Sequence, residues 1–382
     1  MKINEKRLID TVLELIKIDS ESFNEKAVHE VLVKKLKALG ASVYVDNAGK
    51  KYQTNAKGNI IASFKGSVKS QPIILSSHMD TVTPGNGIKP IVKKDRIVSD
   101  GTTILGSDDK AGIAVILEVL QVLKENKLPH PPVEVLFTLT EESGMQGSKN
   151  LEYKKLKGRE GLILDNEDPT ELLVQGPAVN DINVHIKGLA AHAGIAPEKG
   201  ISALEVAAYA LSIMKLGRID KETVANFAII EGGKATNIVT DEITIQGEAR
   251  SLNDAKLAKQ CAHIKACFDK AIKRFTKKID GKVCKPQIKV DISQRYAGVN
   301  APKNHPLVKT VLKVAKDLGV KNMRVAASGG GCDANVMSGY GFTLPNLGVG
   351  MQNCHTLQEY LDLKQFFTAA QIVLGTVLAY KK

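Results

Sequence analysis

Residues 133–144, VEVLFTLTEESG, join a continuous apolar run to a pair of glutamates. The run VEVLFTL is typical of a strand covered on both faces, because a strand with one face in water alternates apolar and polar residues. Such strands belong to sheets that helices cover on both sides. We therefore expect an α/β fold with a mostly parallel central sheet, in which Glu141 and Glu142 lie just beyond the end of one strand.

Helical and strand patterns alternate before this segment, as such a fold requires. We predict helices over residues 4–17, 26–39 and 109–126 and strands over residues 41–45, 59–64 and 72–77. The same alternation returns near the end of the chain, where a helix near 305–318 and the strand MRVAAS precede a terminal helix. Leu357, Leu361 and Phe366 are assigned to that terminal helix.

The middle of the chain has a different pattern. Residues 176–295 read as β-α-β-β-α-β, the order of a ferredoxin-like α+β unit. A chain of 382 residues also exceeds the size at which one hydrophobic core usually keeps growing. We expect a discontinuous main domain of residues 1–175 and 296–382, interrupted by an inserted domain of residues 176–295.

Five residues of metal-binding type lie in turns or at the ends of predicted strands. They are His78 in SSHMDTV, Asp108 in GSDDKAG, Glu142 in TEESG, Asp165 in LILDNE and His355 in GMQNCHT. In open α/β sheets the carboxyl ends of the strands meet at one edge, so residues distant in sequence can share one site there. Imidazole and carboxylate donors together are those that a hydrolytic zinc pair favours.

Seven sequence blocks stand in order between residues 78 and 361: HMDTV, LGSDDKAGIA, TEESGMQGS, GLAAHAG, GGKATNIV, SGGGCDANV and VGMQNCHTLQEYL. Together they resemble the family of zinc aminopeptidases, carboxypeptidases and aminoacylases, in particular its peptidase T-like branch. The resemblance implies that the main domain is a catalytic domain binding two divalent metal ions. Zinc is the expected ion, and cobalt and manganese are alternatives. It also implies that the insert is a lid and dimerisation domain.

The resemblance further assigns roles to the ligands. Asp108 would bridge both ions, with His78 and Asp165 completing one site and Glu142 and His355 the other. A bridging carboxylate offers one oxygen to each ion and holds the two ions about 3.5 to 4 Å apart.

The acidic neighbours of three ligands have expected roles as well. Glu141 is the candidate general base, because adjacent residues at a strand end point in different directions. Asp80 is expected to accept a hydrogen bond from the second ring nitrogen of His78, which would orient the ring. Asp109 is expected to cap the helix that follows it.

Further candidates come from the insert and from a glycine-rich turn. The resemblance implies that His192 stabilises the oxyanion of the intermediate, within one subunit or across a dimer. Asn237 and Arg250 resemble substrate contacts, and Gly330 in SGGGCDAN lines the pocket by the same resemblance. A structural hydrogen bond for His192 and a plain surface cation for Arg250 stay open as alternatives.

Composition excludes several classes of protein. The net charge of +12 includes a basic stretch at residues 269–286, but the helical register over residues 254–278 puts the lysines on the solvated face, so we expect no nucleic-acid partner. No apolar run reaches the roughly 20 residues that a membrane helix needs. The N-terminal stretch MKINEKRLID is charged and has no apolar signal core, so we expect a cytoplasmic location. Five cysteines without a CxxC pair favour reduced thiols.

The expected function is a metal-dependent exopeptidase that releases the N-terminal residue of short peptides. An amidohydrolase of the same scaffold, acting on N-acylated amino acids or as a carboxypeptidase, uses the same attack by water and is the alternative. A non-enzymatic binding protein is disfavoured, because all five ligands and Glu141 are present. The segment between Asp80 and Asp108 is shorter than in peptidase T, which leaves the preferred peptide length open.

Overall fold

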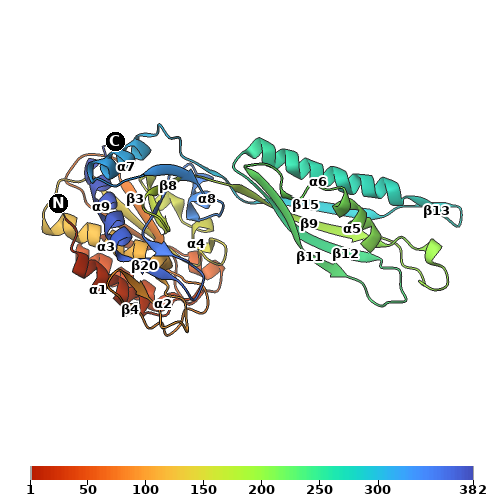
Figure 1. The fold of residues 1–382 in the computed structure, drawn as a ribbon, viewed down its shortest axis with the longest axis horizontal. Helices are drawn as coiled ribbons and strands as arrows, with labels where there is room; N and C mark the ends of the chain where they lie inside the picture. Colours follow the sequence, from red (N-terminus) through yellow and green to blue (C-terminus); the bar gives the residue numbers. More distant parts are fainter. Residues whose placement is uncertain (1, 382) are drawn as a thin grey trace. The chain divides into compact units, whose positions relative to one another are not determined.

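The computed structural model describes residues 2–381 and divides into two compact units (Figure 1). Unit 1 extends to Gly176 and resumes at Val299, and unit 2 is Pro177–Gly298. The hydrophobic clusters of the chain each draw their residues from a single unit. Unit 2 is therefore an insertion with a core of its own.

The large sheet of unit 1 is mixed. Its strand order is β1-β2-β6-β3-β7-β18-β8-β16, and β17 pairs with β8. The strands are β1 (Ser42–Val45), β2 (Ile60–Phe64), β3 (Ile73–His78), β6 (Val133–Thr138), β7 (Glu160–Asn166), β8 (Glu171–Gly176), β16 (Val299–Asn300), β17 (Arg324–Ala327) and β18 (Asn346–Gly348).

Parallel pairing is confined to part of this sheet. The pairs β3·β6, β3·β7, β7·β18 and β8·β17 are parallel. The pairs β1·β2, β2·β6, β8·β18 and β8·β16 are antiparallel. The prediction of a mostly parallel sheet is therefore wrong, because the sheet is mixed and its antiparallel pairs are as many as its parallel ones. β1 and β2 follow each other without an intervening α-helix, a connection typical of antiparallel neighbours.

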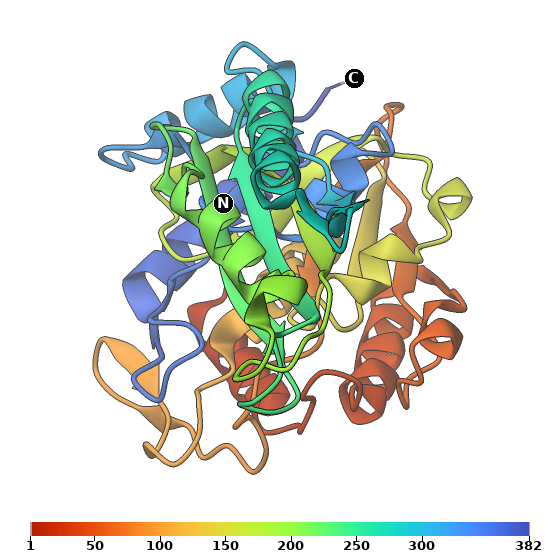
Figure 2. The ribbon, with the colours of Figure 1, turned by 90° about the vertical axis from the view of Figure 1, so that its right-hand side faces the viewer.

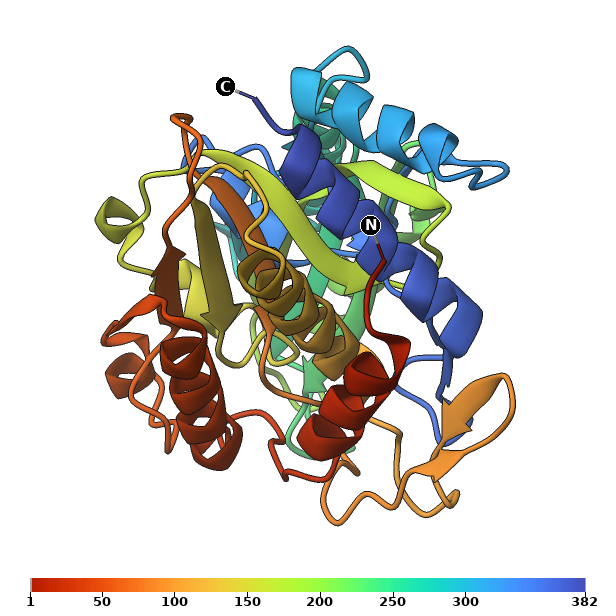
Figure 3. The ribbon, with the colours of Figure 1, turned by 90° about the vertical axis from the view of Figure 1, so that its left-hand side faces the viewer.

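Both faces of the central strands are covered. On β3, Ile73 and Leu75 belong to the main hydrophobic cluster, whereas Ile74 belongs to a second cluster together with Leu136 of β6. This alternation follows from the two-residue period of a strand. On the face of the main cluster α3 packs against both α1 and α9 (Figure 3), and α8 contributes Met337 to the second cluster.

The helices α1, α2, α3 and α7 of unit 1 match predicted ones, whereas α4 was not predicted and the terminal helix begins later than expected. The helices of unit 1 are α1 (Glu5–Ile16), α2 (Lys26–Leu39), α3 (Ser107–Glu125), α4 (Gln146–Lys149), α7 (Pro306–Asp317), α8 (Asp333–Ser338) and α9 (Leu363–Ala379), with 3-10 turns η1 (Ala48–Lys51) and η2 (Tyr153–Lys155). The terminal helix begins at Leu363, because Asp362 caps it by accepting a hydrogen bond from the Gln365 amide. Leu357 and Leu361 are therefore not helical, contrary to the prediction.

A second, small sheet of unit 1 was not predicted. Its order is β19-β20-β5-β4, formed by β19 (Met351–Gln352), β20 (Tyr360–Asp362), β5 (Arg96–Val98) and β4 (Ile91–Val92). Leu361 lies in β20, and its side chain is fully buried. The loop between β19 and β20 carries His355.

Unit 2 is an antiparallel sheet with two helices. The order of its main elements is the predicted β-α-β-β-α-β, and the sheet order is β10-β11-β12-β9-β15. Helices α5 and α6 pack against each other and against the sheet (Figure 2). The elements are β9 (Ala178–Lys187), η3 (Pro197–Lys199), α5 (Ala203–Ser212), β10 (Gly217–Arg218), β11 (Thr223–Gly232), β12 (Glu242–Ser251), α6 (Asp254–Phe275), β13 (Lys277–Ile279), β14 (Lys282–Cys284) and β15 (Gln287–Tyr296).

Two further features concern the chain as a whole. The five cysteines are all free. Among residues 2–381 every helix is too short or too polar to span a bilayer.

Candidate metal centre and active site

Five side chains from distant parts of the chain form two groups of candidate metal ligands in unit 1. The groups are His78, Asp108 and Asp165, and Asp108, Glu142 and His355, and within each group the donor atoms lie within 4.8 Å of one another. Asp108 belongs to both groups. Its Oδ1 lies 3.1 Å from Nε2 of His78, and its Oδ2 lies 3.2 Å from Nε2 of His355. One carboxylate therefore faces a different imidazole with each oxygen.

The sheet brings the first group together. His78 is the last residue of β3, and Asp165 lies near the end of β7, which pairs with β3 in parallel. Parallel neighbours end at the same edge of a sheet. Nε2 of His78 consequently lies 3.9 Å from Oδ1 of Asp165.

Loops complete the second group. Glu142 follows β6, the other parallel neighbour of β3, and His355 lies in the β19–β20 loop with a positive φ of 65°. Nε2 of His355 lies 2.8 Å from Oε1 of Glu142. Asp108 stands at the beginning of α3, where its own φ and ψ are not yet helical. The regular part of α3 begins after Asp109.

The electrostatics of this centre favour bound cations. Burial raises the pKa of Asp165 and of Glu141 well above their usual values, and neighbouring carboxylates add to the shift. Hydrogen bonds with Asp108 and Glu142 raise the pKa of His355 to about 10, so this position stabilises positive charge. Buried carboxylates outnumber the cationic side chains here. The donor set and the excess of negative charge therefore fit a pair of divalent cations.

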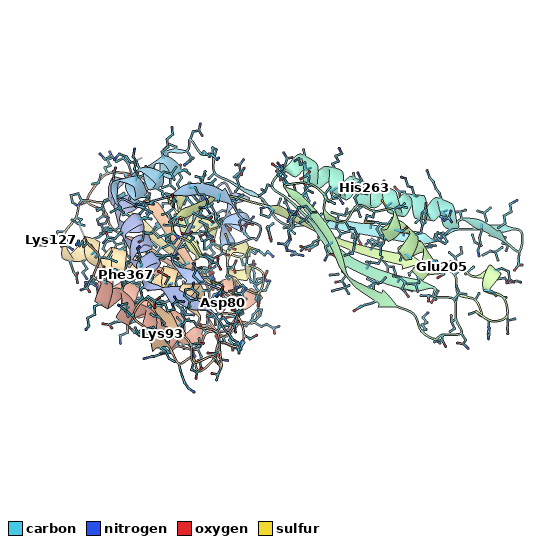
Figure 4. All side chains as sticks on the ribbon, in the orientation of Figure 1. Asp80, Lys93, Lys127, Glu205, His263 and Phe367 are labelled. Atoms are coloured by element: carbon cyan, nitrogen blue, oxygen red, sulfur yellow. The ribbon has the colours of Figure 1, made fainter. Side chains whose placement is uncertain are left out.

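Asp80 supports both His78 and the loop after β6 (labelled in Figure 4). Nδ1 of His78 lies 3.0 Å from the backbone oxygen of Asp80 and 3.3 Å from its Oδ1. The Asp80 carboxylate also accepts hydrogen bonds from the amides of Glu141 (2.8 Å) and Glu142 (3.2 Å) and from Oγ of Ser22 (2.7 Å). Asp80 thus fixes the ring of one candidate ligand and the backbone of another.

Asp109 does not cap α3, contrary to the expectation. Its Oδ2 accepts hydrogen bonds from Oγ of Ser77 (2.5 Å) and from the amide of His78 (3.2 Å). The backbone of Asp109 has not yet adopted helical φ and ψ angles, and its side chain turns toward β3. Asp109 therefore holds the end of β3 rather than the end of a helix.

Sequence reasoning missed several buried residues that support the ligands. Glu359 accepts hydrogen bonds from the amides of Gly106 (2.8 Å), Ser107 (2.7 Å) and Asp108 (3.2 Å). Asn346 accepts from the amide of Asp165 (2.9 Å) and donates to its carbonyl (2.6 Å). Glu359 lies inside the block VGMQNCHTLQEYL, but no spacing rule connects it with Asp108.

Lys110 is a buried cation next to this centre. Its Nζ donates a hydrogen bond to Oγ of Ser20 at 2.5 Å. Burial lowers the pKa of Lys110 to about 8, although the nearby carboxylates of Asp80 and Asp109 oppose that shift. The sequence could have pointed to Lys110, because this residue directly follows the Asp108–Asp109 pair.

The remaining candidates belong to neither of the two ligand groups. Gly330 lies in an exposed turn between β17 and α8, where its amide donates to Oγ of Ser328 at 3.0 Å. In unit 2, His192 and Asn237 are both exposed and come from neighbouring segments: the amide of Ala193 donates to the carbonyl of Asn237 at 2.9 Å.

Arg250 lies at the other end of the unit 2 sheet. Nε of Arg250 donates to Oε1 of Glu248 at 2.5 Å, and Arg250 pairs with Val179 at the beginning of β9. Glu242, the first residue of β12, pairs with Lys187, the last residue of β9. His192 follows β9 and forms a bridge with Ile238, which precedes β12, so His192 belongs to this end of the sheet. Arg250 lies eight residue steps along β12 from Glu242, which is about 26 Å at roughly 3.3 Å per step. A single short peptide cannot contact both ends of one copy of unit 2.

Mixed imidazole and carboxylate donors at the carboxyl edge of a mixed α/β sheet, beside a buried glutamate, define the class of metal-dependent hydrolases. The model of peptidase family M20/M25/M40 matches residues 74–379. The chain belongs to this family, and it is a hydrolase that acts on peptide bonds.

Three similar proteins match the chain over nearly its full length. The uncharacterized protein YqjE of Bacillus subtilis strain 168 is 39% identical over 376 residues, covering 98% of each chain. The crystal structure of aminopeptidase PepT from Bacillus cereus ATCC 10987 matches with a TM-score of 0.91, 39% identity and 99% coverage of both chains. That of a tripeptidase from Staphylococcus aureus subsp. aureus Mu50 matches with a TM-score of 0.91 and 37% identity, covering 99% of this chain and 100% of the other.

Proposed function

We propose that this protein is a metal-dependent exopeptidase of the peptidase T type, which releases the N-terminal residue of short peptides. The observation that carries the proposal is the position of Asp108, which offers one oxygen to each of two ligand groups. The similarity to an aminopeptidase and to a tripeptidase at 39% and 37% identity supports the same substrate class.

Each ligand group would hold one divalent ion. His78, Asp108 and Asp165 would bind one ion, and Asp108, Glu142 and His355 the other. When bound, the two ions would polarise the scissile carbonyl and lower the pKa of the attacking water. We propose zinc, because mixed nitrogen and oxygen donors suit it, and cobalt or manganese can occupy such donors as well.

Glu141 is the proposed general base. It takes a proton from the attacking water and gives it to the departing amine. Burial raises the pKa of Glu141 well above its usual value, which favours the uptake of a proton by this carboxylate. Asp80 keeps the ring of His78 in a fixed orientation, which increases the basicity of the imidazole toward a cation.

Unit 2 is the proposed lid and dimerisation domain, with a ferredoxin-like fold over residues 176–295, and residues 1–175 and 296–382 form the catalytic domain. His192 would donate to the oxyanion, while Asn237, Arg250 and Gly330 would contact the substrate. Because Arg250 and His192 lie at opposite ends of the unit 2 sheet, they would serve one site only if each came from a different subunit.

The edge of unit 2 supports dimerisation. Beyond the two-residue pairing with β10, β11 has no strand on its outer side within residues 2–381. Ile229 and Ile230 on this strand are 46% and 51% exposed. An exposed apolar edge strand is a template for pairing with another chain, and we propose that a second copy pairs there.

The five free cysteines support a cytoplasmic location, since reducing compartments keep thiols unpaired. The substrate would be a short peptide, and we propose neither a nucleic-acid nor a membrane partner.

A matched pair of assays tests the function. Zinc- or cobalt-loaded protein is incubated with free-amine di- and tripeptides and with N-acetyl amino acids, and the products are identified. We expect release of N-terminal residues from the peptides. In Glu141→Gln the metal content should stay at two ions per chain while kcat falls by about 10²- to 10⁴-fold, the share of a positioned base. Release of products from N-acetyl amino acids alone would instead establish the amidohydrolase, and full turnover in Glu141→Gln would refute the assignment of the base.

A further inference from the structure

A buried carboxylate outside both ligand groups holds the backbone next to Glu141. Glu25, at the beginning of α2, has a fully buried side chain. Its Oε1 accepts hydrogen bonds from the amide of Thr140 at 2.9 Å and from Oγ1 of Thr140 at 2.5 Å. Its Oε2 accepts a hydrogen bond from Oγ1 of Thr54 at 3.1 Å. Both polar groups of Thr140 that can donate are therefore bound to one carboxylate.

Thr140 needs such a partner because of its backbone conformation. Its φ is +49°, in the left-handed region, which a β-branched residue rarely adopts because of the clash with its own Cβ. Conformations of this kind persist only where the surroundings determine them. Thr140 is also the residue directly before Glu141, so its φ and ψ set the direction in which the Glu141 side chain leaves the strand end.

Two carboxylates together hold three successive amides. Glu25 accepts from Thr140, and Asp80 accepts from Glu141 and Glu142. Asp80 also contacts His78, so its function cannot be separated from that of a ligand. The carboxylate of Glu25 contacts only Thr140 and Thr54 among the hydrogen-bond partners in the described chain. Its hydrogen bonds reach the centre through Thr140, while its charge also acts on Asp80 and Lys110.

We propose that Glu25 is a positioning residue for the general base: it fixes Thr140 in the left-handed conformation and thereby aims the carboxylate of Glu141. The proposal rests on the proposed function of Glu141. Glu25 belongs to neither group of candidate metal ligands. Its removal therefore affects the rate of the chemical step rather than binding of the peptide or of the ions.

The test uses the full chain loaded with zinc. Glu25→Ala removes the acceptor, whereas Glu25→Gln keeps one oxygen that can accept from Thr140. Glu134→Gln is the matched control, because Glu134 is also a buried carboxylate that accepts from backbone amides, those of Lys157 and Gly158, at the opposite end of β6. Bound zinc, kcat, KM and thermal stability are measured for each variant with a tripeptide substrate.

We expect Glu25→Ala to lose on the order of 10²-fold in kcat, the size expected when a catalytic group is misplaced by about 1 Å. Its KM and its zinc content should stay unchanged, because only the transition state is affected. Glu25→Gln should recover most of the rate. The control Glu134→Gln should keep the wild-type kcat even where its stability falls.

A second variant separates an effect on the orientation of Glu141 from an effect on the stability of the fold. Glycine adopts a φ of +49° without a steric penalty, so Thr140→Gly in the Glu25→Ala background should restore part of kcat. A Glu25→Ala protein that loses stability but retains full kcat would overturn the proposal, as would loss of zinc in parallel with rate. If Glu141→Gln itself kept full turnover, the failure would lie with the assigned base and not with Glu25.

Discussion

Asp108 has a chemical position that no other candidate ligand shares. Each of its oxygens faces a different imidazole, at 3.1 Å and 3.2 Å. Loss of any other ligand removes a donor from one group, whereas loss of Asp108 removes a donor from both. The adjacent Asp109 contacts Ser77 and the amide of His78 instead. Two identical side chains in sequence thus have different tasks because their backbones direct them to different neighbours.

His29, on α2, makes the stability of unit 1 depend on pH. Its side chain is buried, and Nε2 has no hydrogen-bond partner among residues 2–381. Burial lowers the pKa of His29 below its ordinary value of 6.5, while the carboxylates of Glu30 and Asp46 oppose the shift. The folded state therefore binds this proton less readily than the unfolded state. The stability that neutral His29 contributes is fully present above the unfolded pKa. This contribution is lost as pH falls through 6.5 toward the folded pKa.

The variant His29→Gln should remove this dependence. Between pH 8 and pH 5 the wild-type free energy of unfolding should fall more steeply than that of the variant, by no more than about 1.4 kcal/mol per pH unit, the limit for one proton. Denaturant titrations at each pH measure the free energy of unfolding of both proteins. The difference between the two free energies at pH 8 gives the packing cost of the substitution. Equal slopes for the two proteins would contradict the prediction.

At the scale of elements, the beginning of α3 depends on the β19–β20 loop. Glu359 in that loop accepts hydrogen bonds from three successive amides, including that of Asp108. Glu359→Ala leaves these buried donors without acceptors, at about 1–3 kcal/mol for a buried group. We expect lower stability and a metal affinity reduced by about 10- to 100-fold, the usual effect of losing a residue that orients a ligand.

Glu134→Ala provides the comparison for that variant. Glu134 also holds two backbone amides, but at the far end of β6. The Glu134→Ala protein should lose stability, measured by denaturation, without losing affinity for metal, measured by competition with a chelator. Equal losses of metal affinity in the two variants would show that Glu359 affects metal binding only by stabilising the fold.

The elements that could be predicted from sequence are those with long apolar patterns. The helices α1 and α2 fall where apolar periodicity placed them, and the strands β3 and β6 fall where apolar runs placed them. The short strands β16, β18, β19 and β20 have two or three residues, too few to show a period. Leu357 and Leu361 have helical spacing, yet Asp362 starts the helix after them. Local spacing cannot show which of two possible starts the tertiary structure selects.

The candidate site also contains residues that the sequence could identify and residues that it could not. His78, Asp108, Glu142, Asp165 and His355 could be recognised because each stands in a distinctive block. Glu25, Glu359 and Asn346 could not, because each is a single polar residue whose partner lies far away in sequence, and only folding reveals the contact. Lys110 is the intermediate case, since its position next to Asp109 was visible while its burial was not.

For the whole molecule, the main prediction concerns assembly through β11. Wild-type protein should sediment as a dimer, and the double variant Ile229→Lys/Ile230→Lys should sediment as a monomer, because charges on an edge strand oppose pairing. Val283→Lys is the control, since Val283 is 68% exposed on the β13–β14 hairpin of the same unit. A monomeric wild type, or a dimer that survives the double substitution, would remove β11 as the interface.

The order in which the ligands occur along the chain has a consequence for biosynthesis. The donors of the first group are all present once Asp165 has been made, whereas the second group needs His355, which follows the whole of unit 2. Proteins are made from the N-terminus, and early domains begin to fold while later ones are still being translated. His355 is therefore made only after unit 2, and so are Asn346 and Glu359, which hold the backbone of Asp165 and of Asp108. Both proposed metal sites are consequently completed only late in synthesis, after the ribosome has released the inserted domain.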